Sequence, residues 1–123
     1  ERARAARFMQ IEVNRGLPVT LLVKYFVQHG IDWQLKDIVR NRVRFERFDL
    51  RRSMSGMGPF DVVFCRNVLI YFDQPTKEQI VRAMRQTVNL GGYLLLGGAE
   101  SLRNADDIFV RQTMGQAVVY RAI

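Results

Sequence analysis

The 123-residue chain has one cysteine and one histidine, and this scarcity excludes several kinds of site. Cys65 alone cannot form an intramolecular disulfide, and a single thiol fits a reducing compartment. One cysteine and one histidine are too few for a zinc cluster, so no metal site is predicted. A Ser-His-Asp or Cys-His catalytic site would have to use His29. We interpret His29 as a surface residue, because Gly30 beside it marks a turn.

The chain also lacks a long apolar run and is poor in lysine. No stretch approaches the roughly 18–20 apolar residues of a membrane span, and no secretory signal opens the sequence. Lysine occurs only at positions 24, 36 and 77 among 19 basic residues, and the net charge is +7. This charge leaves open a nucleic-acid partner, an acidic protein partner, or arginine used in place of lysine without a binding role. The arginine-rich stretch 40–52 is interpreted first as a solvated face.

The first half of the sequence predicts short elements. Residues 1–15 are typical of a helix with an apolar side that includes Phe8 and Ile11. Residues 18–26 predict a second helix with Pro18 in its first turn. Strands are predicted at 33–36 and 43–50, and a loop at 53–59. Because the sequence begins on Glu1 in mid-pattern, without a methionine, we expect a piece of a longer protein.

The second half predicts a parallel strand–helix–strand unit followed by a hairpin. The apolar run 60–65 predicts a buried strand. The helix is predicted over 76–90, with Thr76 and Gln79 in capping-box spacing and Gly91 and Gly92 at its end. A second buried strand follows at 93–97, and two alternating segments, 108–114 and 117–123, surround a Gly115-Gln116 turn. A right-handed crossover joins the two parallel strands. The expected fold is therefore the latter half of an α/β sheet.

Two polar residues, Arg66 and Asn67, interrupt the apolar stretch "FDVVFCRNVLIYF" directly after the strand 60–65. Ligands of open parallel sheets bind just beyond the carboxyl ends of the strands. The functional interpretation is that both side chains face a ligand. The structural alternative is that Arg66 caps a loop or forms a salt bridge with Asp61 or Asp73, and that Asn67 supports a turn.

The same residues carry a family resemblance. The segment "FDVVFCRNVLIYFDQPTKEQIVRAM", followed by "LGGYLLLGGAESL", resembles the C-terminal part of the CheR-type chemotaxis receptor methyltransferases. The earlier motifs "VNRGLP" and "VRFERFDL" match the family pattern in order. The resemblance implies the C-terminal half of a Rossmann-like methyltransferase sheet with a small antiparallel β-subdomain. The expected divisions are a helical segment at 1–23, the β-subdomain at 24–46, which is a candidate for receptor docking, and a partial sheet at 47–123.

The resemblance also implies an activity and a set of site residues. Family members are cytoplasmic enzymes that move a methyl group from S-adenosylmethionine to glutamate carboxylates of membrane chemoreceptors. The positions that match the family's cofactor contacts are Asp49, Leu50, Arg66 and Asn67, and the catalytic candidates are Tyr71 and Arg66. A glutamate with a reference pKa of roughly 4.3 is already ionised at neutral pH, so no histidine base is needed.

Several parts of such an enzyme are missing from the sequence. The only G-x-G, Gly56-Met-Gly58, precedes a strand rather than following one, and the family's N-terminal domain and first strands are not found. We therefore expect an incomplete cofactor site and an inactive fragment. The unpaired edge of the strand at Phe60 predicts a strand-exchanged or edge-paired homodimer.

Two alternatives remain open: a non-enzymatic basic module that binds an acidic protein, and a nucleic-acid-binding domain, although no nucleic-acid partner is expected. Glu100 and Ser101 are expected to support a loop, and Cys65 to be a buried core thiol.

Overall fold

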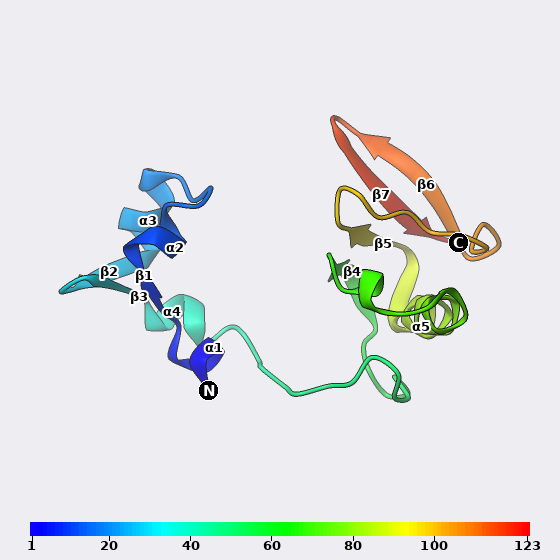
Figure 1. The fold of residues 1–123 in the computed structure, drawn as a ribbon, viewed down its shortest axis with the longest axis horizontal. Coiled ribbons are helices and arrows are strands. Elements are labelled where there is room, and N and C mark those ends of the chain that lie inside the picture. Colours follow the sequence, from blue (N-terminus) through cyan, green and yellow to red (C-terminus); the bar gives the residue numbers. More distant parts are fainter. The chain divides into compact units, whose positions relative to one another are not determined.

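The computed structural model describes residues 1–123 and divides into two compact units, Glu1–Arg47 and Phe48–Ile123 (Figure 1). The mixed α/β fold class expected from the sequence is confirmed, because the first unit contains an antiparallel three-stranded sheet and the second a mixed four-stranded sheet. No helix is both long enough and apolar enough to cross a bilayer.

The first unit is built around a β-hairpin and a third strand. Its elements in chain order are α1 (Arg2–Ala5), β1 (Arg7–Met9), α2 (Gln10–Val13), α3 (Val19–Tyr25), β2 (Phe26–His29), β3 (Asp32–Leu35) and α4 (Asp37–Arg40). The strand order is β1-β3-β2, and both pairings are antiparallel. Gly30, with φ 60°, allows the tight turn between β2 and β3. The aromatic rings of Phe8 and Phe26 meet edge to face, with centroids 5.9 Å apart.

The single helix expected over residues 1–15 is wrong. The chain leaves α1 at Ala6, which has a left-handed φ of 50°, and enters β1. Phe8 then pairs with Trp33, and the amide of Leu35 donates to the Ala6 carbonyl oxygen at 3.0 Å. Pairing with β3 therefore overrides the helix propensity of the alanines. The short helix expected over 18–26 is confirmed as α3, which begins directly after Pro18.

The strand expected over residues 43–50 is also wrong, because residues 43–49 have no regular secondary structure. Strands need a neighbour that accepts their backbone hydrogen bonds, and no strand pairs with this segment. The alternating apolar residues that suggested the strand, Val43, Phe45 and Phe48, are exposed. The carbonyl oxygen of Phe45 instead accepts a hydrogen bond from the Arg4 guanidinium at 3.1 Å.

The second unit contains the expected strand–helix–strand arrangement and hairpin. Its elements are β4 (Phe60–Cys65), the 3₁₀ turn η1 (Leu69–Tyr71), α5 (Gln74–Thr87), β5 (Val88–Leu96), β6 (Phe109–Met114) and β7 (Ala117–Ala122). The strand order is β4-β5-β7-β6. Strands β4 and β5 are parallel, and the other two pairings are antiparallel. The carboxyl ends of β4 and β5 consequently lie at the same edge of the sheet.

Helix α5 begins and ends earlier than expected. Its N-cap is Asp73, whose carboxylate accepts the amide of Thr76 at 2.9 Å, so the Thr76–Gln79 capping box is wrong. This hydrogen bond lowers the pKa of Asp73. At the other end Val88 adopts an extended conformation and pairs with Phe60, which starts β5 before the two glycines. Gly91 and Gly92 therefore lie inside β5 rather than at the helix end.

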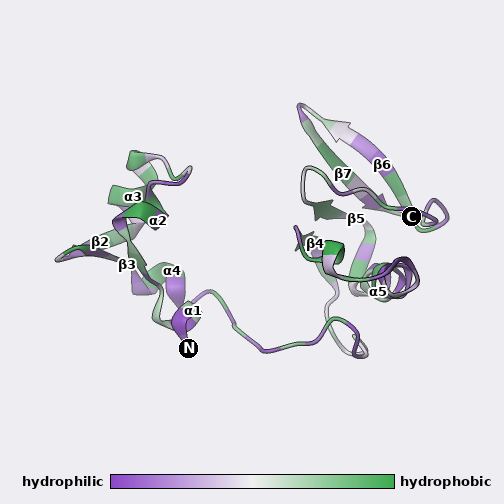
Figure 2. Ribbon diagram, viewed as in Figure 1, coloured by the Kyte–Doolittle hydropathy of each residue, from purple (hydrophilic) through white to green (hydrophobic).

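The core of the second unit lies between α5 and one face of the sheet. Ile80, Val81 and Met84 of α5 are buried with Leu94 of β5 and Phe109 of β6. Figure 2 shows hydrophobic colouring along β5 and β7, whereas α5 carries both hydrophobic and hydrophilic residues, as a helix with one buried side does.

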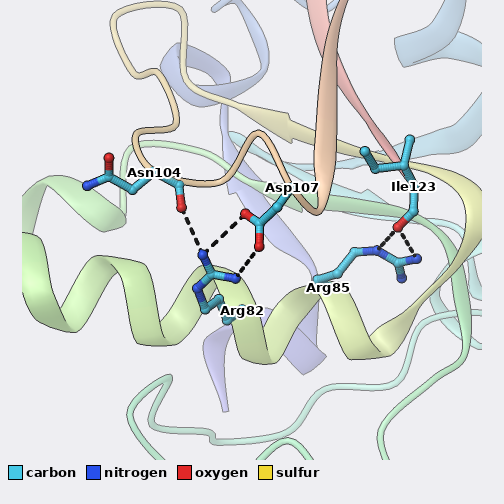
Figure 3. Close-up of polar contacts among 5 residues, drawn as sticks. All are labelled: Arg82, Arg85, Asn104, Asp107 and Ile123. Atoms are coloured by element: carbon cyan, nitrogen blue, oxygen red, sulfur yellow. Dashed lines mark hydrogen bonds and ion pairs between the residues drawn. The ribbon is translucent and has the colours of Figure 1, made fainter.

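Two arginines on α5 add polar contacts at the edge of this core (Figure 3). Arg82 donates to the carboxylate of Asp107 at 3.0 and 3.2 Å and to the Asn104 carbonyl oxygen at 3.0 Å. The guanidinium holds the pKa of Asp107 below its usual value. Arg85 donates to the carbonyl oxygen of Ile123 at 2.9 and 3.2 Å. These contacts fix the segments at the start of β6 and the end of β7 against the helix.

Strand β4 is buried on one face only, so the expectation of a fully buried strand is wrong. Cys65 is buried and Val63 is half-buried on the side of α5, which confirms the expected core thiol. Burial raises the pKa of the Cys65 thiol, with a smaller contribution from the charge of Glu100. On the other face Phe60, Val62 and Phe64 are 42%, 46% and 68% exposed. The reason is that β4 is the outermost strand of its sheet and α5 covers only one side.

Candidate functional site

The end of β4 presents the polar pair that the sequence singled out. Arg66 and Asn67 follow Cys65 directly, and both side chains are exposed. Asn67 has a left-handed φ of 60°, a conformation that asparagine tolerates better than most residues and that ends the strand abruptly. The chain then turns into η1, where Leu69 is buried in the core. The buried Leu69 and the ordered strand β4 hold the two polar residues between them.

The ion pairs of the structural alternative do not form at Arg66. Asp61 accepts a hydrogen bond from the side-chain amide of Asn89 at 2.9 Å, and Asp73 caps α5. Arg66 makes neither a hydrogen bond nor an ion pair within the chain. Asn67 does stand in a turn, as that alternative expected.

Glu100 joins the carboxyl ends of the two parallel strands. Its Oε2 atom accepts the backbone amides of both Asn67 and Gly97, each at 2.7 Å. The loop-supporting role expected for Glu100 is therefore confirmed. Its other oxygen, Oε1, is buried without a hydrogen-bond partner. The carboxylate acts as a clamp that fixes the backbone at Asn67 relative to the end of β5.

Position 97, beside the Glu100 clamp, has room only for glycine. A Cβ atom at Gly97 would collide with Oδ1 of Asn67 and would come within 2.7 Å of Oε2 of Glu100. The neighbouring Gly98 has open space around the same position. The side chain of Asn67 thus packs over the end of β5 in space that only glycine leaves free.

A cavity of about 540 Å³ lies beside the clamp. It is lined by Arg66, by the loop 97–101, and by Arg111 and residues 116–118 of the β6–β7 hairpin. Arg111, like Arg66, makes no hydrogen bond or ion pair within the chain. The lining also contains the Glu100 carboxylate, so the cavity places two guanidinium groups and one carboxylate around one opening.

The other predicted site residues lie apart from this cavity lining. Tyr71 ends η1 and is 80% exposed, with no hydrogen bond at its hydroxyl. Asp49 accepts the Arg51 guanidinium at 3.1 and 2.8 Å and the Arg51 backbone amide at 3.0 Å, and these hydrogen bonds lower the pKa of Asp49 to about 2. Leu50 is half-buried against the core cluster. No hydrogen bond joins Asp49 or Leu50 to Arg66 or Asn67, so the structure groups only the last two.

Sequence reasoning missed Arg111 and the role of Gly97. Arg111 reaches the cavity only because β6 pairs with β7 and β7 with β5, a register that no local pattern gives. The signal for Gly97 was its place directly after an apolar run at a strand end, but a glycine there is equally typical of an ordinary loop.

Comparisons with known proteins bear on this site. Residues 1–118 match the family described as "CheR methyltransferase, SAM binding domain". The chain is 38% identical over 121 residues to chemotaxis protein methyltransferase 1 of Pseudomonas aeruginosa, covering 98% of this chain and 44% of that protein. It is 36% identical over 120 residues to chemotaxis protein methyltransferase Cher2 of Pseudomonas putida, covering 97% and 44%. It is 36% identical over 122 residues to the chemotaxis protein methyltransferase of Vibrio parahaemolyticus, covering 98% and 44%. The chain therefore spans less than half the length of these relatives.

Proposed function

The chain belongs to the CheR methyltransferase family, and on that premise we propose that it forms part of a cytoplasmic enzyme that methylates glutamate side chains of membrane chemoreceptors. S-adenosylmethionine is the proposed methyl donor. The observation that carries the proposal is the pair Arg66–Asn67, fixed by Glu100 at the carboxyl edge of a parallel sheet and matched to a SAM-binding domain. Similarity of fold alone does not support a particular activity, whereas polar side chains held at the edge of the sheet, where ligands bind, do support one.

The residues at this edge fit a ligand with an amino-acid end. Arg66 offers a guanidinium with no partner in the chain, and Asn67 offers an amide that can both donate and accept. Because Gly97 has no Cβ atom, the side-chain amide of Asn67 can lie at the end of β5; a Cβ atom there would collide with it. We propose that Arg66 and Asn67 hold the cofactor, with Asp49 and Leu50 contributing from the preceding segment. When bound, S-adenosylmethionine would supply an electrophilic methyl group on a sulfonium centre.

The proposed contribution of the chain to the reaction is positioning. The acceptor carboxylate is ionised at neutral pH and needs no proton removed. Arg66 can orient it by paired hydrogen bonds. This grip has to be limited, because an interaction that holds the ground state as tightly as the transition state gives no acceleration. The exposed hydroxyl of Tyr71 is available to a group bound beside η1.

We further propose that the 123-residue chain alone binds the cofactor weakly and does not transfer methyl groups. Its sheet contains one parallel pair of strands, β4 and β5, and the turn after β4 carries Arg66 and Asn67 rather than glycines. The edge therefore offers side-chain contacts to one part of the cofactor and no glycine-rich cradle for the rest.

A chimera tests the function and the weakness of the isolated chain together. The matched 121 residues of the Pseudomonas aeruginosa relative would be replaced by this chain. Methyl transfer to receptor cytoplasmic domains and titration calorimetry with S-adenosylhomocysteine would be measured for the chimera and for the isolated chain. We expect activity and binding in the chimera and neither in the isolated chain at micromolar ligand. A folded but inactive chimera would contradict the proposed function, and micromolar binding by the isolated chain would contradict its proposed weakness.

An arginine-lined cavity in the first unit favours a second proposed role for the chain, which is to bind an acidic protein segment such as a receptor tail. A cavity of about 810 Å³ in this unit is lined by Arg4, Arg40, Arg44, Phe45 and other residues of 40–46. Of these arginines, Arg40 and Arg44 already pair with Asp37 and Glu46. Binding of an acidic peptide that persists at moderate salt, with DNA binding lost steeply as salt rises, would support a protein partner over nucleic acid.

A further inference from the structure

The β6–β7 hairpin extends past the edge of the sheet where the proposed cofactor residues lie. Pairing of β7 with β5 includes Leu94 opposite Tyr120, whereas pairing of β6 with β7 continues to Met114 opposite Ala117. Figure 1 shows the hairpin tip reaching beyond the end of β5. The hairpin thus forms a wall beside the carboxyl ends of β4 and β5.

Arg111 of β6 lines the same cavity that Arg66 lines from the end of β4. Neither guanidinium has an acceptor within the chain, although five other basic side chains of the protein are paired with carboxylates. Glu100 is the one carboxylate in the lining. Its Oε2 is already engaged by two backbone amides, and its Oε1 is buried without a partner. The cavity therefore carries one uncompensated positive charge.

We propose that Arg111, together with Arg66, binds a carboxylate in this cavity. A guanidinium presents a planar fork of N–H donors that matches a carboxylate in paired hydrogen bonds. One additional carboxylate would balance the charge of two arginines and one glutamate. A second cation would be repelled, and a neutral group would leave the excess charge uncompensated. The volume of about 540 Å³ accommodates a side chain or the amino-acid end of a larger ligand.

This inference rests on the proposed function, which supplies two carboxylates: that of the cofactor's amino-acid end and that of the acceptor glutamate. The chemistry that Arg111 recognises is the same in both cases. Kinetics can separate them, because a contact to the cofactor changes the KM for S-adenosylmethionine, whereas a contact to the acceptor changes the KM for the receptor.

The kinetic test uses the chimera with Arg111→Gln, Arg111→Lys and the control Arg103→Gln, which removes the same charge from an exposed loop position outside this cavity. We expect Arg111→Gln to raise one of the two KM values about tenfold, the effect of losing about 1.4 kcal/mol of binding. Arg111→Lys should recover part of the loss, and Arg103→Gln should change neither value by more than about twofold. Equal effects of the two glutamine variants, or no effect of Arg111→Gln, would overturn the proposal.

A second measurement on the 123-residue chain does not depend on activity. The side-chain Nε–H signals of its arginines would be followed by NMR during titration with glutarate and with the neutral glutaramide. We expect the signals of Arg66 and Arg111 to shift with glutarate only, and the Arg66 shift to shrink in the Arg111→Gln variant. Equal shifts with both compounds, or an equal shift at Arg103, would overturn the proposal even if the chimera were inactive. An inactive chimera with the expected NMR result would contradict the proposed function and leave the carboxylate site supported.

Discussion

Removing the Glu100 carboxylate tests whether one side chain fixes the candidate site. In the Glu100→Ala variant the backbone amides of Asn67 and Gly97 lose an acceptor that each now reaches at 2.7 Å. A buried donor left without an acceptor costs about 1–3 kcal/mol. Glu100 is half-buried, so water can replace part of what is lost. We therefore expect the free energy of unfolding to fall by about 2 kcal/mol for the two bonds together.

Matched variants distinguish the loss of the two Glu100 hydrogen bonds from the general effect of removing a side chain. Glu100→Gln keeps one carbonyl oxygen that can accept both amides, and it places an uncharged NH2 group where the unpartnered Oε1 atom lies. Its expected loss is at most about 1 kcal/mol. Glu100→Asp is one methylene shorter, so its carboxylate should not reach both amides and its loss should be close to that of alanine. Asp106→Ala is the control, because Asp106 is an exposed carboxylate nearby in sequence.

The assay is urea unfolding together with amide hydrogen exchange. The unfolding midpoint should decrease at constant slope, and the amides of Asn67 and Gly97 should exchange faster in Glu100→Ala. The amide of Ile123, which donates to the Ile108 carbonyl oxygen at 3.0 Å, should be unaffected by local opening. The reasoning is refuted if Glu100→Ala unfolds at the same urea concentration as the parent, or if Glu100→Gln loses as much as Glu100→Ala.

Three further predictions follow from the second unit. Gly97→Ala should disturb the chemical shifts of Asn67 and Glu100, whereas Gly98→Ala, which meets open space, should not; equal effects would contradict the clamp geometry. The Asp49 carboxyl should titrate by NMR near its pKa of about 2, and Arg51→Gln should raise that value toward 3.8. Since the folded pKa is the lower one, the stabilisation from Asp49 is present above about pH 3.8 and is lost as the pH falls toward 2; an unchanged titration in Arg51→Gln would refute this cause. The unpaired edge of β4, with Phe64 68% exposed, should make the chain form dimers in light scattering, and Phe64→Lys should reduce them; a strict monomer at high concentration would count against edge pairing.

The fold could be predicted from the sequence where local pattern and tertiary pairing agree. The position of the strand at 60–65, the helix stripe with Ile80 and Met84, and the hairpin around Gly115 all follow from local patterns. The apolar run at 60–65 nevertheless indicated burial on both faces, and one face of that strand is exposed. The prediction failed where they conflict. The alanines of residues 1–6 favour a helix, but Phe8 is drawn into a strand by Trp33, which lies 25 positions later. The alternating residues 43–50 have the pattern of a strand but no strand beside them.

The residues of the candidate site could likewise be predicted where a local pattern marks them, and not where they depend on tertiary pairing. Arg66 and Asn67 could be identified because polar residues that interrupt an apolar strand cost free energy unless they have a partner or a function. The hydrogen bonds of Glu100 and the place of Arg111 could not be identified, because both depend on which strands adjoin. A separation of 33 positions between Asn67 and Glu100 leaves no periodic signal in the sequence.

The Glu100 hydrogen bonds distinguish two properties of the site: the shape of the turn at Asn67 and the affinity of the site for the cofactor. The face of β4 that carries Val62 and Phe64 is exposed, but the turn at Asn67 is fixed by Glu100, which also binds the backbone amide of Gly97 directly after β5. Covering the exposed face is therefore not required to shape the turn. We expect the Arg66–Asn67 edge to be formed already in a chain whose affinity for the cofactor is low. Weak binding by the 123 residues would then reflect too few contacts rather than a disordered site, and added contacts would gain affinity without a further cost of ordering this turn.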